Sequence, residues 1–125
     1  MLMDTPATFG EFIASRRKQA ELTMREFADR IGVTAPYLSD IEKGRRAAPD
    51  SKLEAIAVAL ELTQVEREEM FDLAARTRDH QVSVDLTDYI MDTGGARVAL
   101  RRAKERALTD EQWEEIVKII EGDWK

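Results

Sequence analysis

The chain has 125 residues and a formal net charge of −6, and it contains no cysteine. A chain of this length holds one domain, or one domain and a small appendage, and can bury a hydrophobic core. The lack of cysteine excludes disulfides, a thiol nucleophile and a thiolate zinc site. No stretch reaches the roughly 18 apolar residues of a membrane span, so we expect a cytoplasmic protein without a membrane partner.

The acidic charge lies entirely in the second half of the chain. Residues 1–60 contain nine Lys or Arg and nine Asp or Glu, whereas residues 61–125 contain ten and sixteen. In the neutral half, basic residues cluster at 16–18 and at 43–46. Such clusters are usually solvated helix ends, but phosphate binding also depends on local rather than total charge.

The first predicted helix carries an apolar stripe with one arginine inside it. Phe9, Phe12, Ile13 and Ala20 recur at helical spacing, and Arg17 falls within the stripe. A guanidinium that faces a core needs an acidic partner, because an unpaired buried charge is very costly.

Residues 23–44 predict two short helices joined by a tight turn. Thr23 and Glu26 have the spacing of a capping box, Thr34 is a second N-cap, and Gly32 supplies the positive φ of the corner. Each helix has an inner apolar face, made of Met24, Phe27, Ala28 and Ile31 in the first and Tyr37, Leu38 and Ile41 in the second. The pattern is typical of a helix pair that places its second helix in a DNA major groove. An ordinary αα-hairpin has the same pattern.

Two more helices follow this pair. The fourth is expected to start at Asp50 or Ser51, with Ser51-x-x-Glu54 as a capping box, and the fifth at a box of Thr63 and Glu66. Their inner faces are predicted to hold Leu53, Ile56, Ala57, Leu60, Val65, Met70, Leu73 and Ala74.

The remaining chain predicts a linker at 78–84 and about three short helices at 85–125. Gly94 and Gly95 are expected to end the first of these helices, residues 96–107 form the second, and a box of Thr109 and Gln112 opens the third. The third has a strong apolar stripe, and the basic run from Arg97 to Arg106 is interpreted as a solvated face rather than a DNA contact. These helices are too few for a large core, so they pack on the first domain, on each other or on a second copy.

Residues from about 9 to 76 resemble the Cro/phage-repressor (XRE-type) helix-turn-helix family. The matching motifs are Phe9-x-x-Phe12-Ile13-x-x-x-Arg17, Phe27-Ala28-x-x-Ile31-Gly32-Val33-Thr34, Tyr37-Leu38-Ser39-x-Ile41-Glu42-x-Gly44 and Pro49-x-x-x-Leu53-x-x-Ile56-Ala57-x-Ala59-Leu60. The resemblance implies an all-α protein with a five-helix lambda-repressor-like domain at 8–77, which binds double-stranded DNA, usually as a homodimer.

The resemblance also implies roles for individual residues. Arg17 and Glu42 correspond to a structural ion pair that holds the recognition helix. The predicted DNA-binding residues are Thr23, Arg25, Thr34, Ala35, Pro36, Ser39, Asp40, Lys43, Arg45 and Arg46. The recognition positions depart from the family, which often has Gln, Asn or Arg there, so readout is expected to depend on Ser39, Lys43, methyl contacts or DNA shape.

No motif points to catalysis, a cofactor or a metal. The chain has no Gly-rich phosphate loop and no nucleophile elbow, and its lone His80 lies in the predicted linker. Three functions stay open: a dimeric repressor, an antitoxin-type regulator whose C-terminal helices bind and neutralise a partner protein, and a helix-turn-helix used only for protein interaction.

Overall fold

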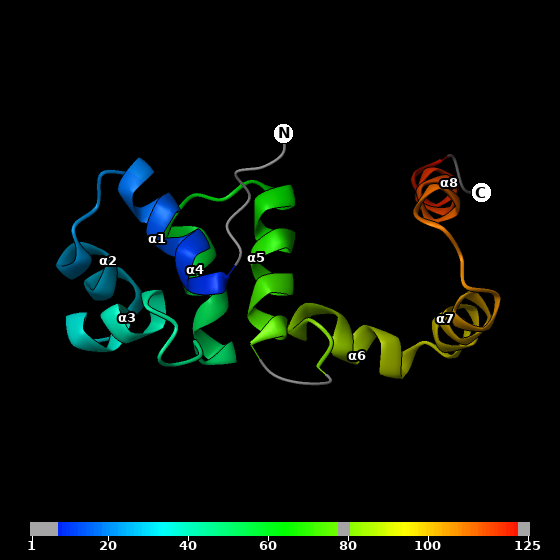
Figure 1. Cartoon of the computed structure of the whole chain (residues 1–125), viewed down its shortest axis with the longest axis horizontal. Helices are drawn as coiled ribbons and strands as arrows, with labels where there is room; N and C mark the ends of the chain where they lie inside the picture. The colour runs from blue at the N-terminus through cyan, green and yellow to red at the C-terminus, as the bar shows by residue number, and fades with distance from the viewer. Residues whose placement is uncertain (1–7, 78–80, 123–125) are drawn as a thin grey trace. The chain divides into compact units, whose positions relative to one another are not determined.

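A computed structural model describes residues 8–77 and 81–122, and this part of the chain is helical without strands (Figure 1). The all-α prediction is confirmed. The elements are α1 (Phe9–Gln19), α2 (Met24–Ile31), α3 (Ala35–Glu42), a short 3-10 turn η1 (Asp50–Lys52), α4 (Leu53–Ala59), α5 (Gln64–Arg76), α6 (Val84–Asp92), α7 (Gly94–Arg106) and α8 (Asp110–Glu121).

Threonine side chains start most of these helices. Capping boxes form at Thr23 with Glu26, at Thr63 with Glu66 and at Thr109 with Gln112, as the sequence predicted. The predicted box at Ser51 is wrong. Residues 50–52 form the 3-10 turn instead, since the Lys52 N–H donates to the Pro49 carbonyl at 2.9 Å, and α4 begins at Leu53 without a side-chain cap.

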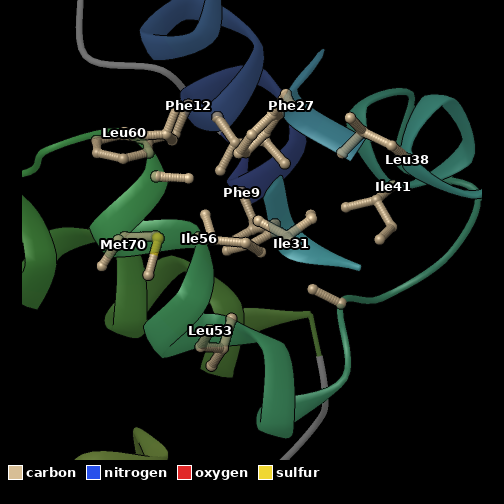
Figure 2. Packing of buried hydrophobic residues seen from close by; sticks show 14 of the residues in the cluster. Phe9, Phe12, Phe27, Ile31, Leu38, Ile41, Leu53, Ile56, Leu60 and Met70 are labelled. Carbon is tan, nitrogen blue, oxygen red and sulfur yellow. The ribbon is translucent and has the colours of Figure 1, made fainter. Parts of the chain in front are cut away.

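Helices α1 to α5 enclose one hydrophobic core. Figure 2 shows aromatic and aliphatic side chains from α1, α2, α3, α4 and α5 meeting in one cluster. Phe12, Phe27, Ile13, Leu38, Leu53, Ile56 and Met70 are fully buried. Such complete burial makes α1–α5 a stable frame for the exposed α3 surface.

Two predicted core positions lie outside this cluster. Ala20 is exposed because α1 ends at Gln19 and Ala20 is its C-cap. Val65, in the first turn of α5, is 73% exposed. Leu22 and Phe71, which the apolar pattern did not select, are buried.

The chain divides into two compact units, residues 1–87 and 88–125. Of the predicted linker at 78–84, residues 78–80 with His80 lie outside the described residues. Ser83 is buried, and its hydroxyl donates to the Asp72 carboxylate, which fastens this part of the predicted linker to α5.

Gly94 and Gly95 do not end a helix, contrary to the sequence prediction. They open α7, and α6 ends at Asp92 before an extended Thr93. The Arg97 guanidinium donates to the carbonyls of Ile90, at 2.9 Å, and Met91. These bonds satisfy carbonyls at the end of α6, so the break is made by a side chain of the next helix rather than by glycine conformation. No helix among the described residues is long and apolar enough to cross a membrane.

Candidate nucleic-acid interface

The corner between α2 and α3 is held by caps on both sides. The Thr23 hydroxyl accepts from the Glu26 N–H at 3.0 Å, and the Glu26 carboxylate accepts from the Thr23 N–H at 2.8 Å. Gly32 ends α2 with φ 75°, and the Thr34 hydroxyl accepts from the Tyr37 N–H at 3.2 Å to start α3. Every residue type in the corner therefore matches its backbone position.

The Thr23 hydrogen bonds also affect the acidity of Glu26. The Thr23 backbone N–H, followed by its side chain, lowers the pKa of the Glu26 carboxyl below its ordinary value of 4.5. Glu66 in the equivalent box of α5 has its pKa lowered, first of all by the Thr63 backbone N–H. Both carboxylates are thus stabilised in their charged form by the hydrogen bonds of the box.

Arg17 and Glu42 clamp α3 to α1. The Nε atom of Arg17 lies 2.8 Å from Oε2 of Glu42, and its Nη2 lies 3.2 Å from Oε1. The third nitrogen, Nη1, donates to the Leu22 carbonyl at 3.0 Å. The Arg17 and Glu42 side chains are only 12% and 7% exposed. A bidentate pair with this little exposure fixes the orientation of both helices.

Gly10 brings the two helices into direct backbone contact, and the sequence analysis missed it. A Cβ atom at Gly10 would lie 2.6 Å from the Ile41 carbonyl oxygen and would also clash with the Glu42 backbone. Only glycine permits this approach of α1 to the end of α3. A glycine next to the Phe9–Phe12 stripe, inside a helix, is the signal that could have identified it.

The predicted DNA-binding residues gather around α3. Thr23 and Arg25 at the start of α2 are exposed, as are Thr34, Pro36 and Lys43 along α3 and just after it. Ser39 and Asp40 are half-buried. Ala35, also one of the predicted DNA-binding residues, packs partly against the core, since it lies one turn before the buried Leu38.

The loop after α3 presents two arginines. Gly44 turns the chain with φ 80°, and the Arg45 N–H donates to the Asp40 carbonyl at 2.8 Å. The Arg46 guanidinium stacks 4.5 Å from the centre of the Tyr37 ring. The Arg45 Nη1 lies 3.7 Å from Oδ1 of Asp40, so a cation stands beside the one acid on the recognition surface. This arrangement reduces the repulsion of phosphate by Asp40.

A hollow of about 350 Å³ adjoins this loop. The start of α1, the end of α3 and the end of α5 line it, with apolar side chains together with Arg45, Arg46 and Arg76. Arg76 was not selected from the sequence because it is 30 residues beyond Arg46, and only the packing of α5 brings it to the loop. Arg45, Arg46 and Arg76 thus place positive charge around one hollow, with the Arg46 guanidinium over Tyr37 and that of Arg45 beside Asp40.

The other basic cluster, at residues 16–18, is used differently. Arg16 contacts Glu66 at 3.1 Å and stacks over the Phe12 ring, and Arg17 pairs with Glu42. Two of its three cations therefore serve packing inside the unit. Among the described residues, no group of His, Cys, Asp and Glu side chains is placed to hold a metal ion.

The geometry agrees with a family comparison. The family model described as a helix-turn-helix domain matches residues 8–70, half of the chain. The chain belongs to the helix-turn-helix family. The XRE-type resemblance that the motifs carried is thereby confirmed.

Relatives of the domain have regulatory names. The chain is 44% identical over 54 residues to an "uncharacterized HTH-type transcriptional regulator" of Mycobacterium tuberculosis, found in strains CDC 1551 and H37Rv. This match covers 43% of the chain and 39% of each mycobacterial protein, so the chain spans well under half of their length. It is 35% identical over 77 residues to the "ImmF control region 10 kDa protein" of Bacillus phage phi105, covering 54% of the chain and 86% of the phage protein. No solved structure matches the chain.

Proposed function

We propose that this protein is a sequence-specific DNA-binding transcriptional regulator that acts as a dimeric repressor. The observation that carries the proposal is the fixed position of α3. The Arg17–Glu42 pair and the close contact at Gly10 hold its inner side, while Thr34, Pro36 and Lys43 stay exposed. A helix held in this way, with an open outer face, is suited to the major groove.

Phosphate contacts are assigned to both sides of α3. Thr23 and Arg25 lie at the start of α2. Lys43 directly follows α3, and Arg45 and Arg46 lie in the loop after it. Arg76 joins this second group through the hollow next to the loop. Backbone contacts of this kind position the helix and supply salt-dependent affinity without reading sequence.

Base contacts are assigned to Thr34, Ala35, Pro36, Ser39 and Asp40, with Lys43. The serine hydroxyl can donate or accept, the Asp40 carboxylate can accept from the amino group of cytosine, and the apolar groups suit the thymine methyl group. Arg45 lies beside Asp40, and its positive charge offsets the repulsion between the Asp40 carboxylate and the DNA phosphates. Because this surface has few long polar side chains, we expect DNA shape to contribute a large part of the sequence selectivity.

Dimerisation and repression are inferred from the short length of the recognition helix. One short recognition helix reads only a few base pairs, so two half-sites about one helical turn apart are expected in an inverted repeat. A small dimer bound there blocks access of other proteins to the DNA and needs no further activity to repress. The phage relative's name, which refers to a control region, supports a role in transcription control.

Selection of bound duplexes from a random pool tests the function. An inverted repeat is the expected result, and equal recovery of all sequences would contradict sequence-specific binding. The selected duplex then serves for salt titrations of the Arg45→Ala/Arg46→Ala double variant. Its log–log salt slope should fall by up to about one unit per lost phosphate contact.

The matched control for the titration is Arg30→Ala. Arg30 is an exposed arginine of α2 that lines a different hollow, with Glu54 and Val58. Its variant should keep the salt slope of the wild type. A slope unchanged in the double variant, or lowered equally in Arg30→Ala, would remove Arg45 and Arg46 from the phosphate contacts.

A further inference from the structure

Helices α7 and α8 leave large apolar side chains in solvent. Trp113, Val117, Ile119 and Ile120 of α8 are 36% to 62% exposed, and Val98 and Leu100 of α7 are 52% and 43% exposed. Among the described residues of this second unit only Ala103 is buried. Apolar faces of this kind are normally covered by another surface.

The two helices carry equal and opposite charge. α7 has five basic residues and one acidic residue, whereas α8 has five acidic residues and one basic residue. Among residues 88–122, the ion pair that forms is Arg102 with Glu105, within α7 itself. No ion pair between described side chains joins α7 to α8 of the same chain, so their complementary charges remain available to another molecule.

We propose that a second copy of this chain covers these faces, with α7 of each protomer packed against α8 of the other. A two-fold interface must be self-complementary, and a unit that carries one basic and one acidic helix meets this requirement. The apolar stripes then lie inside and the opposite charges face each other at the edges. Pairing of α7 with α7, or of α8 with α8, would place like charges together, so the charge pattern also determines which helices pair.

The stripe of α8 has the spacing that such packing needs. Trp113, Ile116, Val117 and Ile120 recur at helical period, and Glu114 and Glu121 border them on one edge. On α7, Leu100 and Ala103 lie in the corresponding stripe, bordered by Arg101 and Lys104. Leu100 is 43% exposed and can pack against the large residues of α8 of a second copy, whereas Ala103 is already buried in its own chain.

This interface deepens the proposed function by naming the surface that forms the dimer, and its test needs no DNA. Light scattering and sedimentation of the full chain at micromolar concentration should give the mass of a dimer. Two variants that reverse the charge along one edge of a stripe should dissociate: Arg101→Glu/Lys104→Glu, which makes that edge of α7 acidic, and Glu114→Lys/Glu121→Lys, which makes that edge of α8 basic. The dimer dissociation constant should rise at least about tenfold in each.

Mixing the two variants separates this model from pairing within one chain. In an equimolar mixture each acidic stripe edge of one variant meets a basic stripe edge of the other, so a heterodimer of wild-type affinity should form. Pairing of α7 with α8 inside one chain predicts no such rescue. Circular dichroism of each variant checks that its helices persist.

A control variant, Lys18→Glu/Arg30→Glu, makes the same change in net charge as Arg101→Glu/Lys104→Glu, but in the first unit, and should remain dimeric. Three results would overturn the proposal: a monomeric wild type, reversed variants that still dimerise, or a mixture that stays monomeric. A monomeric wild type would leave the apolar faces to a different protein, as in an antitoxin. A dimer that selects no DNA sequence would contradict the proposed function and leave this interface intact.

Discussion

The two units of this protein use the same local signals but reach different degrees of burial. α2, α5 and α8 each begin with a threonine capping box and each carry an apolar stripe. Most side chains of the stripes in α2 and α5 are buried in one core, with Val65 as an exception, while those of α8 remain at least partly in solvent. A cap and an apolar stripe are thus enough to form a helix, but a hydrophobic core also needs neighbouring helices that pack against the stripe and cover it.

The first unit has those neighbours because its helices approach one another closely. Gly10 lets α1 contact the backbone at the end of α3, and the Arg17–Glu42 pair fixes the same junction. In the second unit the corresponding signals are absent from the described residues: Gly95 meets nothing within 4 Å, and the ion pair of α7 stays within α7. The following experiments test this contrast.

Removal of Glu42 should have the largest effect. Glu42→Ala leaves the Arg17 guanidinium, which is 12% exposed, with only the Leu22 carbonyl as partner. The free energy of unfolding of the first unit should fall by about 3–5 kcal/mol, the cost of breaking a buried pair. Thermal and urea unfolding measure this change.

The matched control is Glu105→Ala in α7. Glu105 pairs with Arg102 at 3.5 Å, and both side chains are about two-thirds exposed. This change should alter stability by less than about 0.5 kcal/mol. A melting temperature of Glu42→Ala within a degree or two of wild type would show that the two pairs are equivalent, and the contrast between the units would fail.

Two glycine substitutions should come next in size. Gly10→Ala places a methyl group against the Ile41 and Glu42 carbonyls and should cost about 1–3 kcal/mol, since overpacking forces the backbone to shift. Gly95→Ala meets no neighbour and should be neutral or stabilise α7 by up to about 1 kcal/mol. Denaturant unfolding decides between these values, and equal effects at the two positions would disprove the close approach at Gly10.

The ends of α2 and α7 offer a reciprocal exchange. Both end in the left-handed region, at Gly32 with φ 75° and at Ala107 with φ 51°. Gly32→Ala should cost about 1–2 kcal/mol, and Ala107→Gly should gain less than about 1 kcal/mol. Amide hydrogen exchange in the last turns of α2 and α7 measures each effect, and a change of the same sign in both variants would contradict the backbone account.

The smallest expected effect is a difference in acid sensitivity between the capping boxes. The Glu26 and Glu66 pKa values lie below the ordinary value of 4.5 in the folded state. Their stabilising contribution is therefore complete above that ordinary pKa and is lost as the pH falls through the lowered folded-state pKa. The box of α8 has Gln112, which does not titrate.

NMR titration of the first-turn amides should show this difference. The amides of Thr23 and Thr63, which donate to the Glu26 and Glu66 carboxylates, should shift at acidic pH. Glu26→Gln and Glu66→Gln should abolish the acid-dependent shift of the Thr23 and Thr63 amides while the box geometry persists, as Gln112 shows it can. An acid response of the Thr23 and Thr63 amides that is unchanged in these variants would mean that the two carboxylates are not the titrating groups.

The helices and the family could be predicted from the sequence because they depend on interactions between neighbouring residues. Thr23, Gly32 and Thr34 define the α2–α3 corner through caps and a positive φ, which involve only neighbouring residues. The spacing of Phe9, Phe12 and Arg17 predicted the buried face of α1 for the same reason, since a helix places such residues on one side.

The tertiary structure decided what depends on distant parts of the chain. The packing of α5 brought Arg76 to the loop of Arg45 and Arg46, which lies 30 residues earlier in the chain. The clash that makes Gly10 necessary also arises from a helix more than 20 residues away. Periodicity and caps describe how a segment satisfies its own backbone, but which segments meet is determined by how side chains fill space between them.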